Sequence, residues 1–173
     1  MRAGRVTLVL AGLTGLALLL SVPGALREAY ERGGLYLFSW AFFEDIPRRL
    51  TGPGRFRFLM QPAVAILLGI RDGRQDAHAG RPPYLLALLL GGPDRREQMR
   101  SGFRSVVNLL LMGILLDSVF QWVILGVSHP GAALVVGPVL ITAPYGLARA
   151  LANRATRLKM RARPGGGQAP VSS

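Results

Sequence analysis

The chain has 173 residues, no cysteine and a formal net charge of +12, and half of its residues are hydrophobic. The absence of cysteine excludes a disulfide framework, thiol catalysis and a cysteine-ligated zinc site. The basic residues are arginines with one exception, Lys159, and they flank apolar segments. This distribution favours membrane lipids with anionic headgroups as partners and argues against nucleic acid.

The first predicted element is an apolar segment without a charged residue, from position 6 to position 22. It is longer than the apolar core of a secretory signal peptide, which runs about 7–15 residues. Pro23 also occupies position −3 of a potential cleavage site after Ala25, where a signal peptide has a small residue. We therefore interpret residues 1–26 as an uncleaved N-terminal transmembrane anchor.

Residues 27–57 form a polar and aromatic segment that follows this anchor. Its apolar part is too short before Glu44 to cross a bilayer. Aromatic side chains such as Trp40 and Phe43 are typical of the headgroup region. We predict an interfacial segment.

Residues 58–104 are predicted to combine a short membrane helix with an arginine-rich cytoplasmic loop. The apolar run 58–70 has thirteen residues, and a helix of that length rises only about 20 Å. It could cross at a tilt, re-enter the membrane or lie in the interface. The loop 71–104 carries seven arginines and includes a short apolar stretch, 84–92, that we predict as an interfacial helix.

Residues 105–148 contain two predicted membrane crossings. The run 106–127 carries one charged residue, and 131–148 carries none. About 18 or more mostly apolar residues are long enough to cross a hydrocarbon core roughly 30 Å thick. The pattern predicts a transmembrane helical hairpin, with Tyr145 as an aromatic anchor at the interface.

The predicted fold class is all-α: an integral membrane helical protein with three long transmembrane helices plus one short embedded or interfacial helix. The basic tail 149–173 has six basic residues and no acid between positions 149 and 163, which places the C-terminus in the cytoplasm. The end of this tail, rich in glycine and proline, is predicted to be disordered. If 58–70 crosses, four spans leave the six arginines of 27–57 outside. The arginine count therefore favours three spans.

Asp117 lies near the centre of a predicted span, where an ionisable group costs at least about 2.5–3.5 kcal/mol. Gln121 follows it at i+4 on the same helix face, whereas Asn108 points to nearly the opposite side. Two hypotheses remain open. Asp117 belongs to a proton or cation relay, or its carboxyl group forms hydrogen bonds between helices.

The stretch GIRDGRQDAHAGRPPY, positions 69–84, places two carboxylates, Asp72 and Asp76, on one helix face, with His78 close by. A metal site would need a more defined ligand spacing. Charges that alternate in sign favour a solvated helix face with weak ion pairs.

Three arginines of this stretch, Arg71, Arg74 and Arg81, are candidates for binding a lipid phosphate. Their guanidinium groups match the geometry of phosphate oxygens. The stretch is therefore a candidate binding site for anionic lipid headgroups.

Small residues four positions apart predict close contacts between helices, within the chain or between copies. They are Ala133 and Gly137 in the last span and Thr7, Ala11 and Gly15 in the first.

The motifs FRFLMQP, LGIRDGRQDA and GRPPY, followed by DSVFQ and PYGLAR, resemble a family of uncharacterised bacterial integral membrane proteins. The likeness covers about positions 53–154. The resemblance implies a bacterial inner-membrane location and leaves the activity open. The positions that match the family pattern are Phe56, Gln61, Pro62, Arg71, Asp76, Ala77, Gly80, Arg81, Pro82, Pro83, Asp117, Gln121, Tyr145 and Arg149.

We find no convergent nucleophile, acid and base pair or ligand cluster in the sequence, and therefore expect no catalytic residue, metal or cofactor. The leading hypothesis is a multi-pass inner-membrane accessory or scaffold protein without enzymatic activity, with a membrane-protein partner or a second copy of itself. The alternatives are a small proton- or ion-coupled carrier that uses Asp117, and a protein that binds anionic lipid headgroups through the 71–84 loop.

Overall fold

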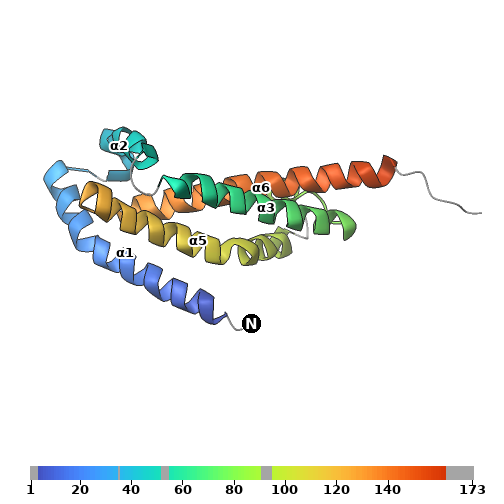
Figure 1. Ribbon diagram of the computed structural model, residues 1–173, viewed down its shortest axis with the longest axis horizontal. Helices are drawn as coiled ribbons and strands as arrows, with labels where there is room; N and C mark the ends of the chain where they lie inside the picture. Colours follow the sequence, from blue (N-terminus) through green and yellow to red (C-terminus); the bar gives the residue numbers. More distant parts are fainter. Residues whose placement is uncertain (1–3, 35, 52–54, 91–94, 163–173) are drawn as a thin grey trace, which may run out of the picture.

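Helices account for nearly all of the regular structure in the computed structural model, and they form an elongated bundle (Figure 1). The structure describes residues 4–34, 36–51, 55–90 and 95–162, and no strand occurs among them. The elements are α1 (Arg5–Arg32), the 3-10 turn η1 (Tyr36–Phe38), α2 (Trp40–Thr51), α3 (Phe56–His78), α4 (Tyr84–Leu90), α5 (Arg95–Leu125) and α6 (Pro130–Ala162).

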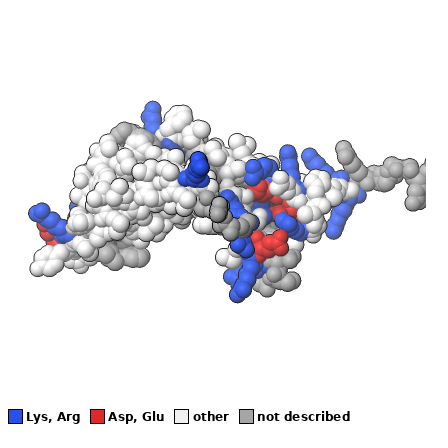
Figure 2. All heavy atoms as spheres, turned by 90° about the horizontal axis from the view of Figure 1, so that it is seen from below, with Lys and Arg blue, Asp and Glu red and all other residues white. Residues whose placement is uncertain are grey.

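Three of the described helices, α1, α5 and α6, are long and apolar enough to cross a membrane. Large apolar side chains on them are exposed, for example Leu19 in α1, which is 70% exposed. Figure 2 shows a broad and largely uncharged surface between the left end and the centre of the molecule, with most charged side chains gathered towards the right. An apolar belt of this size fits lipid rather than water. The prediction of an all-α fold with three long helices that could span a membrane is confirmed.

The helix directions follow from contacts between α1 and α5. Thr7 donates a hydrogen bond to the side chain of Asn108 over 2.8 Å, and Thr14 donates one to the backbone oxygen of Leu111 over 3.1 Å. Sequence numbers therefore rise together along both helices, so α1 and α5 are parallel. A tight turn at Gly126, whose φ of 76° suits glycine, then reverses the chain into α6.

Helix α3 is longer than the predicted short helix at 58–70, because it continues through the charged residues to His78. Its 23 residues rise about 35 Å. It runs parallel to α6 and so close that a Cβ atom on Gly69 would lie 2.5 Å from the backbone oxygen of Tyr145. A Cβ atom on Gly73 would clash with the backbone oxygen of Arg149. Glycine at these two positions is what permits the contact.

Small buried residues at a spacing of four form the α3 side of this contact, and we name them the small-residue stripe. The stripe consists of Ala65, Gly69, Gly73 and Ala77. Among the small-residue positions predicted from the sequence, Gly137 does approach a neighbouring helix, since its Cβ would lie 3.0 Å from the backbone of α5. Gly15 does not, because a Cβ there would meet nothing within 4 Å.

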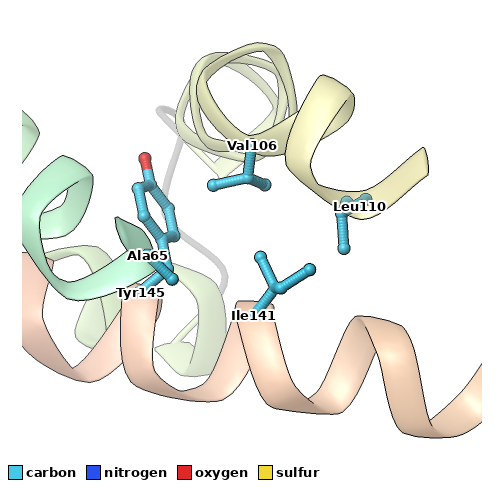
Figure 3. Close-up of a cluster of buried hydrophobic side chains, with 5 residues drawn as sticks. All are labelled: Ala65, Val106, Leu110, Ile141 and Tyr145. Atoms are coloured by element: carbon cyan, nitrogen blue, oxygen red, sulfur yellow. The ribbon is translucent and has the colours of Figure 1, made fainter. Parts of the chain in front are cut away.

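An apolar core lies between α3, α5 and α6 (Figure 3). It is built from Ala65, Val106, Leu110, Ile141 and Tyr145. Tyr145 is only 2% exposed, so the prediction that it anchors the interface is wrong. The core separates the two ends of the bundle, each of which holds buried polar side chains.

The helices also shift the predicted segment boundaries. Helix α5 begins at Arg95, before the predicted hairpin 105–148, and α6 continues to Ala162, so the first part of the predicted tail is helical. Helices α2 and α4 fall where the interfacial segment and the short 84–92 helix are predicted. The predicted disordered end of the chain lies outside the described residues.

Candidate functional site

Arg149 forms the centre of a buried polar cluster at the end of the bundle that carries α4. Its Nε donates to Asp76 Oδ2 over 2.6 Å, and its Nη2 donates to Asp76 Oδ1 over 3.1 Å. This is a bidentate ion pair between α6 and α3. The guanidinium group also donates to the hydroxyl groups of Tyr145, over 2.9 Å, and Ser101, over 3.3 Å. We call Asp72, Asp76, Ser101, Tyr145 and Arg149 the Arg149 cluster.

Two tyrosines, Tyr145 and Tyr84, also contact the charged groups of this cluster. Tyr145 donates its hydroxyl proton to Asp72 over 2.8 Å, which joins α6 to α3 a second time. The ring of Tyr84 lies 4.5 Å from the Arg149 guanidinium carbon, a cation–π distance. Burial raises the pKa of Tyr84, the Arg149 cation opposes this, and Asp76 raises it further. The phenol is therefore neutral at physiological pH.

The prediction of a solvated, sign-alternating helix face at 71–76 is wrong for its carboxylates. Asp72 and Asp76 are 4% and 2% exposed. They share a face, as their spacing predicts, but this face is turned into the bundle. A buried carboxylate is stable only when it is paired and hydrogen-bonded, and Arg149 and Tyr145 supply those partners.

The three predicted lipid-phosphate ligands do not converge. Arg71 bonds to Asp72, with its Nη2 3.0 Å from Oδ1. Arg81 lies 3.5 Å from both Asp76 and Glu97. Arg74 is exposed and lines a different surface, a groove between α3 and α6.

Metal ligation is not supported at this end of the molecule. His78 is exposed and lines the groove, whereas Asp72 and Asp76 point into the bundle. Across the described ranges, no group of three or more histidine, aspartate or glutamate side chains could hold a metal ion.

A second buried cluster surrounds Asp117 at the opposite end of the core. Arg57 Nη2 lies 2.5 Å from Asp117 Oδ1 and ties α3 to α5. Gln121 Nε2 donates to Asp117 Oδ2 over 2.6 Å, as the shared helix face predicts. The Arg57 guanidinium also packs over the rings of Phe58 and Phe120.

The hydrogen bonds of this cluster continue towards the end of the bundle. The Gln121 side-chain oxygen accepts from the backbone N–H of His129 over 2.8 Å. The His129 ring contacts Glu28 in α1, with Nε2 2.6 Å from the carboxylate, and stacks on Tyr36 at a centroid distance of 3.7 Å. We call Glu28, Arg57, Asp117, Gln121 and His129 the Asp117 cluster. A small hollow of about 180 Å³ adjoins its Glu28 and His129 end.

Asn108, the third predicted intramembrane polar residue, does not join this cluster. It accepts the hydrogen bond from Thr7 in α1, on the other side of α5. The sequence argument that Asn108 and Asp117 face different directions therefore agrees with the structure.

Sequence reasoning missed Arg57, His129 and Arg149 as buried partners. Arg57 and Arg149 were counted as interfacial and tail charges because each lies at the end of an apolar run. A usable signal existed, since the small-residue stripe and the i, i+4 pair Asp72 and Asp76 lie on adjoining positions of one helix. A face that mixes small residues and carboxylates indicates a helix contact with a basic partner.

The chain matches no protein-family model, no curated protein and no solved structure.

Proposed function

We propose that this chain is a multi-pass protein of the bacterial inner membrane that acts as a non-enzymatic accessory or scaffold protein. One observation carries the proposal: the charged side chains inside the bundle form ion pairs with one another. Arg149 pairs with Asp76, and Arg57 pairs with Asp117, each across two helices and each almost fully buried. Side chains engaged in this way hold helices together and are not available to a substrate.

The proposal includes four membrane crossings, with both ends of the described chain on the cytoplasmic side. Because α1 and α5 point in the same direction, the chain between them must return across the bilayer, and α3 has the length and direction to do so. This departs from the three spans that the arginine count favours. Two of the arginines that oppose it, Arg27 and Arg32, pair with Glu31 and Glu28, and Arg57 lies inside the bundle.

Cysteine labelling tests the topology directly, because the chain has no cysteine of its own. Tyr30→Cys, at a residue 90% exposed, and Met160→Cys, 47% exposed, mark the two ends of the bundle. We expect a membrane-impermeant maleimide to label the Tyr30 variant in intact spheroplasts and the Met160 variant only in inverted vesicles. Labelling of both variants from one side would reject four crossings.

The scaffold role is tested by the size of the native assembly. Gentle detergent extraction and native electrophoresis of wild-type membranes should give a discrete complex larger than one chain. The paired change Asp76→Leu with Arg149→Met keeps the helix contact apolar and should keep that complex. A wild-type protein that migrates as a single chain, or a complex lost in the correctly folded paired variant, would overturn the proposal.

A second candidate, a small proton-coupled carrier, is favoured by the continuity of the Asp117 cluster from Glu28 to Arg57. The apolar core closes the way from this cluster to the Arg149 cluster, so transport would require the helices to separate. Proton flux into proteoliposomes that disappears in Asp117→Asn would support the carrier. Flux absent from wild type, or unchanged in that variant, would reject it.

A further inference from the structure

A groove of about 590 Å³ runs between α3 and α6 on the side of the bundle opposite the buried carboxylates. Its walls are two helical stripes. On α3 the lining residues recur every four positions, and on α6 they recur every three or four. The lining residues are Ile66, Ile70, Arg74, His78, Ala148, Leu151, Ala152, Ala155, Thr156 and Lys159.

The groove exists because the helices meet through small side chains. The α6 wall contributes the methyl groups of Ala148 and Ala152, which face Gly69 and Gly73 of the small-residue stripe. The larger side chains of Ile66 and Leu151 stand on either side and are partly exposed, at 39% and 56%. The result is an apolar groove that is open to the surroundings of the bundle.

Chemistry changes along the groove. The end nearer the core is aliphatic, whereas the other end is lined by Arg74, His78 and Lys159. A second hollow of about 420 Å³ continues from that end and shares His78 and Lys159 in its lining. All three basic side chains are exposed. Figure 2 shows Lys and Arg side chains gathered at this end of the molecule, with acidic side chains among them.

Among the described residues, no acidic side chain neutralises the positive charge of the groove. Within the described residues, no carboxylate forms an ion pair with Arg74 or Lys159, and no acidic residue lines the groove. The nearest carboxylates in sequence, Asp72 and Asp76, are turned inwards to Tyr145 and Arg149. Arg71 and Arg81, in contrast, already bond to carboxylates.

We propose that the α3–α6 groove binds one anionic phospholipid, with an acyl chain along Ile66, Ile70 and Leu151 and the phosphate group on Arg74 and Lys159. An apolar groove that ends in basic groups without a described carboxylate partner matches a molecule with a hydrocarbon chain and an anionic head. Basic pockets between transmembrane helices on the cytoplasmic side are a known location for such headgroups. The binding site depends on the proposed membrane arrangement, but cysteine labelling tests that arrangement independently of lipid binding.

The test uses the full chain in nanodiscs of phosphatidylcholine with a minority of dioleoyl phosphatidylglycerol, followed by native mass spectrometry. We expect wild type to retain one phosphatidylglycerol per chain. The double variant Arg74→Gln with Lys159→Gln should lose about 30-fold in affinity, since each basic group near a membrane surface contributes about fivefold. The matched control is Arg154→Gln with Arg161→Gln, which removes the same charge from exposed positions of α6 outside the groove.

Four results would overturn the proposal, three from retention and assembly and one from competition. The first is equal retention by the groove variant and the control variant when both have wild-type helix content. The second is equal retention of phosphatidylcholine, which would mean that the groove does not select the anionic head. The third is a lipid-free dimer, which would mean that a second copy covers the groove. Short-chain dihexanoyl phosphatidylglycerol should compete poorly, and competition as strong as that of the dioleoyl lipid would show that the acyl chain is not held.

Discussion

Replacing Arg149 by methionine should destabilise the α3–α6 contact. The change leaves Asp76 buried and takes one hydrogen-bond donor from Tyr145. Breaking a buried ion pair by removing one partner costs about 3–5 kcal/mol. Arg81 can partly replace the lost cation, because it lies 3.5 Å from Asp76 and is partly exposed. We therefore expect a loss of about 3 kcal/mol in the free energy of unfolding, or about 150-fold in the unfolding equilibrium.

A single reporter cysteine makes this loss measurable. Ser118 is fully buried, and its hydroxyl group has no hydrogen-bond partner among the described residues, so Ser118→Cys is a mild change. Pulse labelling of this thiol in mixed micelles, at rising fractions of denaturing detergent, reports the opened fraction. Arg154→Met is the exposed control and should shift the transition by less than about 0.5 kcal/mol.

The double variant Asp76→Leu with Arg149→Met separates a charge effect from a packing effect. Replacing both partners of a buried pair by apolar residues is often close to neutral, so the double variant should be more stable than Arg149→Met alone. If Arg149→Met unfolds like the Arg154→Met control, or if the double variant is no more stable than the single one, the buried pair does not hold α3 and the reasoning is wrong.

Three further predictions use the same unfolding measurement. Gly73→Ala should destabilise the protein by about 1–3 kcal/mol, because the added methyl group overlaps the α6 backbone. The control Gly12→Ala has open space around it and should be neutral or stabilising. Equal effects of the two changes would contradict the close helix contact. Tyr145→Phe should cost about 1.5–3 kcal/mol, because Asp72 loses a hydrogen bond inside the protein, and a cost no larger than that of exposed Tyr30→Phe would count against it. Arg81→Ala should cost under about 1 kcal/mol, because the ion pairs of Arg81 are long and partly exposed. A loss as large as that of Arg149→Met would mean that Arg81 contributes as much to the stability of the cluster as Arg149 does.

The apolar spans could be predicted from the sequence because bilayer thickness sets a length that a run of apolar residues either reaches or does not. The full extent of α3 could not, because the apolar run ends at Ile70 and the next residues are charged. Whether those charges face water or a partner depends on Arg149, 73 positions after Asp76. The tertiary structure determines which residue is the partner, and residue spacing along one helix cannot predict it.

The same limit applies to Asp117. Its face and its amide neighbour Gln121 follow from helix periodicity, and the hypothesis that it forms interhelical hydrogen bonds agrees with its contact to Arg57. That Arg57 is the partner does not follow from any local pattern, since the sequence offers several arginines at helix ends. Of the three arginines in the lipid-phosphate prediction, only Arg74 lacks a carboxylate partner within the described chain.

The bidentate pair between α3 and α6 also has a consequence for biosynthesis. Asp76 leaves the ribosome 73 residues before Arg149, an interval of about 4–15 s at 5–20 residues per second. Throughout that interval, the nascent α3 carries Asp76 without Arg149 and Asp72 without the Tyr145 hydroxyl group, which are their partners on α6 in the finished bundle. In the proposed four-span arrangement, stable integration of α3 therefore waits for the last helix to emerge, and a ribosome-bound chain ending after α5 should leave α3 extractable from the bilayer.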